Sequence, residues 1–279
     1  DLRDTWGAEI GAHPHHWNTP PLDPKNEGRD PLTRVPSAEL DLELFARKLE
    51  NVLSLGCDFQ KRPLTSFRMG RWDIHKEHWK ILAKLGILTD ASVRPLHGKQ
   101  VGSSAPDHYF ATSMPYWIRT TNGMLFEVPL TVTPIFSVLP KLFSVFEKRP
   151  RPIVRLCNFL KSTMNYWGAL ALLPCYHPLW AMEAVTVLYV KRGGNLLSLT
   201  WHSSEMQAGA TPHLPTEKHV HALLTKVRSY ILWLRRHWNV VCLPMNELRN
   251  TIGATAPIRA CKEEEDWSVT ATNGGLTTK

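Results

Sequence analysis

The pattern of apolar and polar positions along the chain predicts helices and strands in alternation. Apolar residues recur three and four positions apart over residues 37–56, 73–86 and 216–234, which predicts three helices. A fourth helix is predicted over residues 178–192, because Pro178 can start it and Gly193-Gly194 can end it. Short apolar runs predict strands at residues 10–13, 64–67, 87–90, 125–132, 196–201 and 240–243. Strands that alternate with helices are typical of an α/β fold built on a parallel sheet.

The ends of the predicted helices carry capping residues. Ser37, Asp73 and Thr216 stand where an N-cap is expected, because their side-chain oxygens can accept from the first free backbone N–H groups. Gly56 and Gly86 stand where the first two helices are expected to stop. Residues 17–36 are rich in Pro, Asn, Asp and Gly and predict a long loop.

The length of 279 residues and the absence of an internal repeat favour one large domain over residues 1–254. Residues 255–279 are mostly polar and are predicted to form a loosely held tail. The hydrophobic content of 43% and the charged content of 21% are ordinary for a globular protein with a sizeable core.

Composition and charge exclude several classes of function. The net charge of +8 favours acidic partners, but the basic clusters are not interleaved with aromatic residues as in nucleic-acid modules, so no nucleic-acid partner is predicted. No apolar run is long enough for a transmembrane segment, and no signal peptide opens the chain. Because a missing front would carry any such signal, localisation stays open between the cytoplasm and the cell envelope. The five scattered cysteines form neither a zinc ribbon nor a disulfide framework.

The segment Glu9–Pro21 carries three histidines within four residues. Neutral imidazole is the commonest protein ligand of zinc, and side chains two positions apart leave the same face of an extended segment. His13 and His15 can therefore point at one ion. The alternative is a histidine-rich surface loop, because two ligands do not complete a zinc site.

Polar residues follow several of the predicted strands. They are His13, Arg68, Asp90 and His202. In parallel α/β proteins and barrels, chemistry takes place where strands end and loops begin, so these four residues are candidates for one site.

Five segments in this order resemble polysaccharide deacetylases of the NodB-homology type. They are EIGAHPHHWNTPP (9–21), SFRMGRW (66–72), LGILTDASV (85–93), FEVP (126–129) and LTWHSSE (199–205). The resemblance implies a distorted (β/α) barrel and metal-dependent hydrolysis of N- or O-acetyl groups on a polysaccharide or other glycan. The implied cofactor is a divalent ion, most often zinc, that polarises the acetyl carbonyl and a bound water.

The resemblance also implies the metal ligands. His13 matches the first metal-binding histidine. His15 is expected to be the second, with His16 as the alternative.

The remaining roles follow from the same resemblance. His202 matches the general acid, Arg68 the arginine that orients the general base, and Asp90 a carboxylate that pairs with an Arg or His. Trp72 would form a wall of the sugar pocket, and Trp17 is a second candidate for substrate binding. Glu205 is interpreted as a loop carboxylate.

The chain departs from the family at its start. The family's adjacent aspartates, which supply the general base and a metal ligand, should precede the His13 strand, but only eight residues precede Glu9. We therefore expect a chain that lacks its front, and with it a third ligand and the base. Two alternatives are an amidohydrolase-type metal hydrolase, because H-x-H on an early strand is also typical of that class, and a glycan-binding relative without catalysis.

Overall fold

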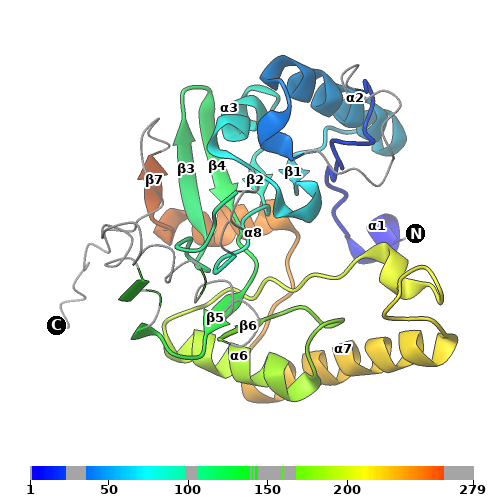
Figure 1. The fold of residues 1–279 in the computed structure, drawn as a ribbon, viewed down its shortest axis with the longest axis vertical. Helices are drawn as coiled ribbons and strands as arrows, with labels where there is room; N and C mark the ends of the chain where they lie inside the picture. Colours follow the sequence, from blue (N-terminus) through cyan, green and yellow to red (C-terminus); the bar gives the residue numbers. More distant parts are fainter. Residues whose placement is uncertain are drawn as a thin grey trace.

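The computed structural model describes residues 2–22, 36–97, 106–138, 140, 142, 143, 159 and 168–260. It is a mixed α/β structure with one five-stranded and one two-stranded sheet, as Figure 1 shows. Its helices, including the 3₁₀ helices η2 to η5, are α1 (Leu2–Trp6), η2 (Ser37–Glu39), α2 (Leu42–Gln60), η3 (Gly70–Trp72), α3 (Lys76–Lys84), α6 (Leu179–Lys191), η4 (Ser203–Met206), α7 (Glu217–His237), α8 (Met245–Ile252) and η5 (Gly253–Thr255).

The larger sheet has the strand order β1-β2-β4-β3-β7. Its strands are β1 (Ser66–Phe67), β2 (Thr89–Asp90), β3 (Tyr116–Thr120), β4 (Gly123–Glu127) and β7 (Ile258–Ala260). β1, β2 and β4 are parallel, whereas β3 and β4 form an antiparallel hairpin and β7 pairs in parallel with β3. At the other edge Ala12 bridges in parallel to Phe67.

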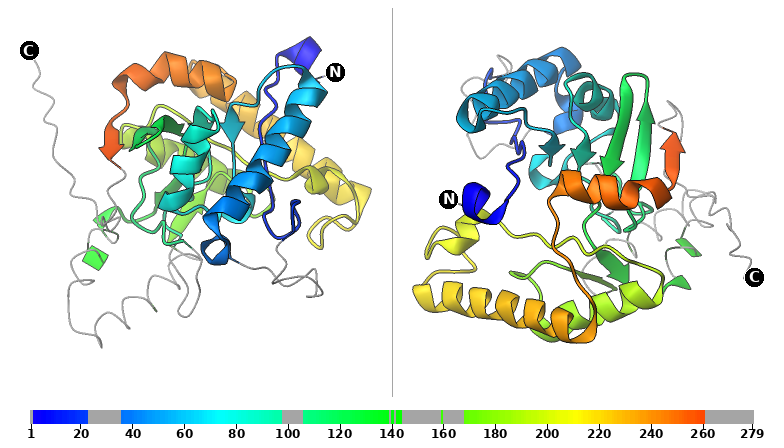
Figure 2. Two further views of the ribbon diagram at one scale, coloured as in Figure 1. Left: turned by 90° about the horizontal axis from the view of Figure 1, so that it is seen from above. Right: turned by 180° about the vertical axis from the view of Figure 1, so that it is seen from behind.

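Helices cover both faces of this sheet. Side chains of neighbouring residues on a strand point to opposite faces, so Leu125 and Phe126 of β4 face different layers. Leu125 packs in the core formed with α2 and α3, and Phe126 packs against residues of α8. Figure 2 shows α8 lying across the strands on the side away from α2 and α3.

The first turn of α8 ties the beginnings of the parallel strands together. Asn246 donates from its backbone N–H and its side-chain amide to the Glu9 carboxylate, at 3.0 and 2.8 Å. The same amide donates to the Thr65 hydroxyl, which precedes β1. Residues 240–243, which were predicted to form a strand, precede this helix and form no strand.

The second layer of the molecule is built on the short sheet and two long helices. β5 (Val132–Pro134) and β6 (Ala169–Ala171) are antiparallel, and α6 and α7 pack beside them, as Figure 1 shows. The hydroxyl groups of Thr186 on α6 and Tyr230 on α7 lie 2.6 Å apart in the buried contact between these helices.

Residues 196–201, predicted as a strand, are part of no strand but make single backbone hydrogen bonds to the ends of the short sheet. Thr131 donates its N–H to the Ser198 carbonyl at 3.3 Å, and Thr200 donates to the Leu172 carbonyl at 3.2 Å. These bonds place the end of the segment beside the short sheet.

The predicted α/β class is confirmed in its coarse form. The parallel strands β1, β2 and β4 alternate with α2 and α3 as expected, but the sheet is mixed because of the hairpin β3–β4. Within the described residues the strands form no closed barrel.

Several predicted boundaries change in the structure. Asp41, not Ser37, caps α2 through bonds to the N–H groups of Glu43 and Leu44, while Ser37 donates to the Asp73 carbonyl. His75 rather than Asp73 precedes α3. Tertiary contacts use these side chains elsewhere, so their capping propensity is overridden.

Two other expectations concern the chain's last residues and membranes. Residues 258–260 fall in the predicted tail yet form β7, because Trp117 donates its backbone N–H to the Pro257 carbonyl and its indole N–H to the Gly253 carbonyl. No helix of the described part of the chain has the length and apolar character required to cross a membrane.

A buried pair of carboxyl groups lies at the end of β2 and β4. Asp90 and Glu127 are register partners, both are 0% exposed, and they contact each other. Asp90 accepts from the Trp79 indole at 2.8 Å and from the Ser92 hydroxyl. Glu127 accepts from the Val93 N–H at 3.1 Å, and among the described groups none donates to its Oε2.

The proton of this pair belongs to Glu127. Burial raises the pKa of both carboxyl groups, and the Asp90 charge raises that of Glu127 further. Because Asp90 receives the donors that stabilise a carboxylate, Glu127 is the neutral partner and donates to Asp90.

We expect the variant Glu127→Gln to become more stable than the wild type as the pH rises. Above the ordinary glutamate pKa of 4.5 the unfolded chain loses this proton while the folded chain keeps it. The unfolding free energy of the wild type then falls by up to about 1.4 kcal/mol per pH unit, and glutamine has no proton to lose. Urea unfolding of both proteins between pH 4.5 and 8 measures the difference, with the exposed Glu77→Gln as control. Parallel pH curves for Glu127→Gln and wild type would show that Glu127 is ionised in the fold.

Candidate functional site

The site candidates gather where neighbouring parallel strands end. Ala12, Phe67, Asp90 and Glu127 stand side by side across the sheet. Ala12 donates to the Ser66 carbonyl at 2.8 Å, and Arg68 donates back to the Ala12 carbonyl at 2.9 Å. The residues that follow Ala12 and Phe67 therefore leave the sheet together.

His13 and His15 form a close pair. Their Nε2 atoms lie 3.3 Å apart, and the Nδ1 of His13 lies 2.7 Å from the Arg68 carbonyl oxygen. A carbonyl accepts only, so Nδ1 of His13 carries the hydrogen and its Nε2 presents a lone pair toward His15.

This geometry fits two ligands of one metal ion. Two Zn–N bonds of 2.0–2.1 Å at a tetrahedral angle separate the nitrogens by about 3.3–3.4 Å. The bond from Nδ1 to a backbone carbonyl is the usual way in which a protein orients a metal-binding histidine. In the described part of the chain no third His, Cys, Asp or Glu joins the pair in a metal-binding group.

Both histidines are neutral near pH 7, as metal ligands must be. Partial burial lowers the pKa of His13, with smaller contributions from the charges of Arg68 and His202. Burial and the charges of His13 and His202 lower the pKa of His15 to about 4. The pair is consequently ready to bind a cation without first losing a proton.

A buried lysine of α2 holds the turn that follows the pair. Lys48 of α2 donates to the carbonyls of Thr19 (2.6 Å) and Pro21, and Thr19 donates its hydroxyl to the His15 carbonyl at 2.9 Å. Lys48 is 2% exposed, so its charge is held in place by carbonyl dipoles. The position of His15 is thereby fixed from its C-terminal side.

Gly70 fixes His15 from the other side. Its N–H donates to the Pro14 carbonyl at 3.0 Å. A Cβ atom added to Gly70 would lie 2.8 Å from the His15 ring, so only glycine permits this approach.

His16 does not belong to the pair. It is 2% exposed and its Nε2 lies 3.9 Å from the Asp73 carboxylate. Of the two residues that the sequence left open as second ligand, the structure places His15 beside His13 and directs His16 into the interior.

Arg68 connects the two layers of the molecule. Its guanidinium donates to the Thr200 hydroxyl at 3.3 Å, and burial lowers its pKa. This contact brings the segment that carries His202 toward the histidine pair, and the charge of His202 acts on both His13 and His15.

His202 is held by Glu205, which the sequence analysis interpreted as a loop carboxylate. Glu205 accepts from the His202 backbone N–H at 2.8 Å, and its other oxygen lies 3.4 Å from the His202 Nδ1. The carboxylate is 2% exposed, and its hydrogen bonds with Cys175 and His202 outweigh burial and lower its pKa. The spacing of three residues in H-S-S-E is that of a capping box, and this signal could have identified the pair.

Asp90 differs from its predicted role. Its partners are Trp79, Ser92 and Glu127 rather than an Arg or His, and it has no exposed surface. The Ser92 hydroxyl also accepts from the Met69 N–H at 2.8 Å. Asp90 thus supports the backbone next to Arg68 and does not reach the surface.

The two tryptophans have different surroundings. Trp17 packs edge-on against His15, with ring centroids 4.7 Å apart, and both Trp17 and Trp72 are half-buried. Trp72 packs on one side against the core of the short sheet.

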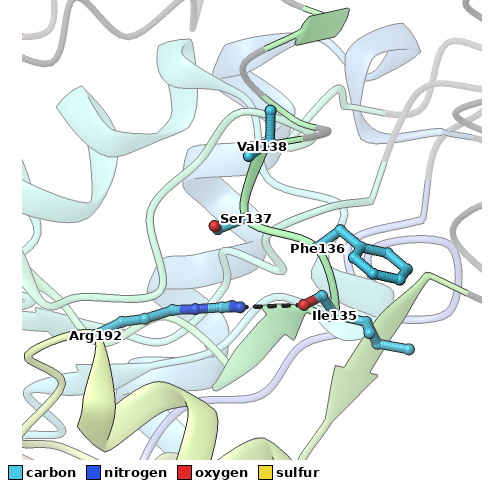
Figure 3. A pocket seen from close by; sticks show the side chains of 5 residues that line it. All are labelled: Ile135, Phe136, Ser137, Val138 and Arg192. Atoms are coloured by element: carbon cyan, nitrogen blue, oxygen red, sulfur yellow. Dashed lines mark hydrogen bonds between the residues drawn. The ribbon is translucent and has the colours of Figure 1, made fainter.

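A surface pocket lies elsewhere, at the end of β5. Figure 3 shows its lining residues, which are Ile135, Phe136, Ser137, Val138 and Arg192. Arg192 donates to the Pro134 and Ile135 carbonyls at 2.6 and 3.2 Å. None of the predicted site residues lines this pocket.

Comparison with known proteins does not extend this picture. The chain matches no protein-family model, no curated protein and no solved structure.

We expect Gly70→Ala to weaken zinc binding by roughly 10- to 100-fold, the range seen when the support of a metal ligand is lost. The added methyl group displaces the His15 ring from its partner. Competition with a chromophoric chelator measures the affinity, and thermal unfolding shows that the variant folds. His221→Ala, which removes an exposed histidine on α7, is the matched control. An unchanged zinc affinity in Gly70→Ala would show that His15 is not a ligand of the metal.

Proposed function

We propose that this protein is a metal-dependent hydrolase that removes acetyl groups from a glycan. The observation that carries the proposal is the His13–His15 pair, with its Nε2 atoms 3.3 Å apart and the His13 Nδ1 bound to a backbone carbonyl. The resemblance of five segments to polysaccharide deacetylases supplies the reaction class.

The proposal assigns His13 and His15 as ligands of a divalent ion, zinc being the first choice for imidazole ligands. When bound, such an ion polarises the acetyl carbonyl and activates a water. The other residues act around it. Arg68, whose guanidinium is anchored by Thr200, supplies positive charge beside the pair and stabilises negative charge that develops on the acetyl oxygen.

His202 is the proposed general acid. The leaving amine or alkoxide must gain a proton, and an imidazole is suited to this transfer near neutral pH. Glu205 acts as a positioning residue, because its buried carboxylate accepts from the His202 backbone and faces Nδ1. The Nδ1 hydrogen is then held by Glu205 and Nε2 is left for the substrate.

The finer fold assignment belongs to the same proposal. A distorted (β/α) barrel is supported by the parallel strands β1, β2 and β4 with their helices, and by the bonds that link Thr131, Leu172 and Thr200 beside the short sheet.

A second candidate function is glycan binding without turnover. It is favoured by one observation, that among the described residues no carboxylate completes a metal-binding group with the histidine pair. The two candidates share a surface and differ in whether acetate is released.

We expect zinc-dependent release of acetate from acetylated glycans that is lost in His13→Ala and His15→Ala. Removal of either imidazole leaves a single ligand and abolishes useful metal affinity. Acetate is measured enzymatically with N-acetylglucosamine hexamer and with O-acetylated xylan, after zinc loading and after chelation. His16→Gln and His221→Ala should keep activity, because neither belongs to the pair. Glycan binding without acetate release by the wild type would decide for the second candidate.

We expect Glu205→Gln to lower kcat by about 10- to 100-fold and to leave KM nearly unchanged, since general acid catalysis contributes about 10²- to 10⁴-fold and His202 itself remains. The variant His202→Ala should show a larger decrease in kcat than Glu205→Gln. A role in positioning predicts an altered pH profile of kcat in Glu205→Gln and partial rescue by Glu205→Asp. A fall in thermal stability with an unchanged kcat would make Glu205 a structural residue only.

A further inference from the structure

The outer face of α7 leaves large apolar side chains in contact with solvent. This helix lies along an outer edge of the molecule and packs on α6, as Figures 1 and 2 show. Its inner face is buried through Val220, Leu223, Val227, Tyr230 and Leu234. On the opposite side Leu224, Ile231 and Leu232 are 41–43% exposed. A surface helix with one buried face ordinarily places polar residues there, so these apolar residues need a reason other than the core.

Arginines are interleaved with these apolar residues. Spacings of three and four residues place side chains in one line along a helix. Four residues of α7 follow this spacing, and they alternate in character: Leu224, Arg228, Ile231 and Arg235. Leu232 and Arg236 each follow a member of this line and lie beside it. These six exposed residues are called the α7 surface below.

The positive charge of the α7 surface is not neutralised within the described part of the chain. There, no carboxylate forms a salt bridge with any of its three arginines. The one acidic residue of α7 is Glu217, which is the first residue of the helix. A carboxylate at this position interacts favourably with the positive end of the helix dipole. The arginines are therefore available to an anionic partner.

The combination of apolar and basic residues on one helix face indicates the kind of partner. At the surface of a bilayer, apolar side chains enter the boundary between headgroups and acyl chains, and the long arginine side chains reach the lipid phosphates. A nucleic acid would engage the arginines but would leave the apolar side chains without a contact. A second copy of the chain fits poorly, because a two-fold contact places the same basic surface against itself.

We propose that the α7 surface binds the surface of a lipid bilayer that contains anionic lipids, with α7 lying in the plane of the interface. The net charge of +8 of the chain acts in the same direction. None of the six residues belongs to the candidate functional site, so this inference does not depend on the proposed hydrolysis of acetyl groups. Each arginine near an anionic membrane surface is expected to raise the affinity about fivefold.

Cosedimentation of the full chain with sucrose-loaded vesicles tests the proposal. One set of vesicles contains phosphatidylcholine alone, and the other contains phosphatidylcholine with about 30% phosphatidylglycerol, which is anionic. The expected result is at least about 20-fold stronger partition onto the anionic vesicles. This preference should shrink when the ionic strength rises from about 0.02 to 0.5 M, because salt screens exposed charges.

Two double variants test the two components of the α7 surface. Arg228→Gln/Arg235→Gln should weaken binding to anionic vesicles by about 25-fold. Leu224→Ser/Ile231→Ser keeps the charge and should weaken the same binding by at least about tenfold, because the apolar side chains no longer enter the bilayer.

Exposed residues of α2 and of the segment after it supply the matched controls. Arg47→Gln/Arg62→Gln removes the same charge from another surface, and Leu55→Ser removes an apolar side chain that is 62% exposed. Both controls should bind anionic vesicles nearly as the wild type does. All the substituted side chains are at least partly exposed, and thermal unfolding checks that each variant folds.

Several outcomes would overturn the inference. Equal losses in Arg228→Gln/Arg235→Gln and in the α2 arginine control would assign the binding to the overall charge of the chain. Unchanged binding of Leu224→Ser/Ile231→Ser would show that the apolar residues do not enter the bilayer. A dimer in sedimentation velocity that Ile231→Ser dissociates, without vesicle binding by the wild type, would make this face a contact between copies of the chain. Acetate release is measured separately and can stand or fail in each case.

Discussion

The reciprocal hydrogen bonds between Ala12 and β1 are the constraint on which the candidate site depends. A parallel bridge at this edge forces His13 and Arg68 to leave the sheet side by side, and the carbonyl of Arg68 then accepts from the His13 ring. The imidazole is oriented by backbone that is itself fixed in the sheet. A ligand held in this way loses little rotamer entropy on binding, which is why sites are built at the ends of regular elements.

The buried carboxyl pair of Asp90 and Glu127 holds the chain that leaves β1 in place. Asp90 accepts from the Ser92 hydroxyl, which accepts from the Met69 N–H, so the chain after β1 is tied to β2. Glu127 contributes by holding the proton that lets two carboxyl groups share one apolar space. At the opposite end of the strands Asn246 ties the same elements together through Glu9 and Thr65. Polar networks at both ends therefore fix the register of very short strands.

The site itself joins two layers that are distant in sequence. The histidine pair comes from the edge of the larger sheet, whereas His202 and Glu205 come from the segment that follows the short sheet. Arg68 links them through Thr200. The Nδ1 of His13 faces the Arg68 carbonyl, and the Nδ1 of His202 faces the Glu205 carboxylate. The Nε2 of His15 faces that of His13. These contacts set the orientations of the rings before any ligand binds.

The sequence by itself determined the elements whose signals are local. Helices α6 and α7 begin directly after Pro178 and Thr216, as predicted, although the Thr216 hydroxyl lies 2.7 Å from the His219 Nδ1 and caps no backbone N–H. Gly86 follows α3 with a φ of 84°, as the stop signal predicted. The candidate residues His13 and Arg68 were found from their places after apolar runs.

Only the tertiary structure decided how these residues are used. The choice between His15 and His16 depends on the contact with Gly70 and on the buried Asp73, neither of which is near in sequence. Asp90 was expected to pair with an Arg or His, but it is buried among Trp79 of α3, Ser92 and Glu127 of β4 instead. Glu205 reads as a loop residue, yet the packing around Cys175 makes it the partner of His202. Local propensity specifies helices and turns, whereas the environment of a polar side chain is set by residues far along the chain.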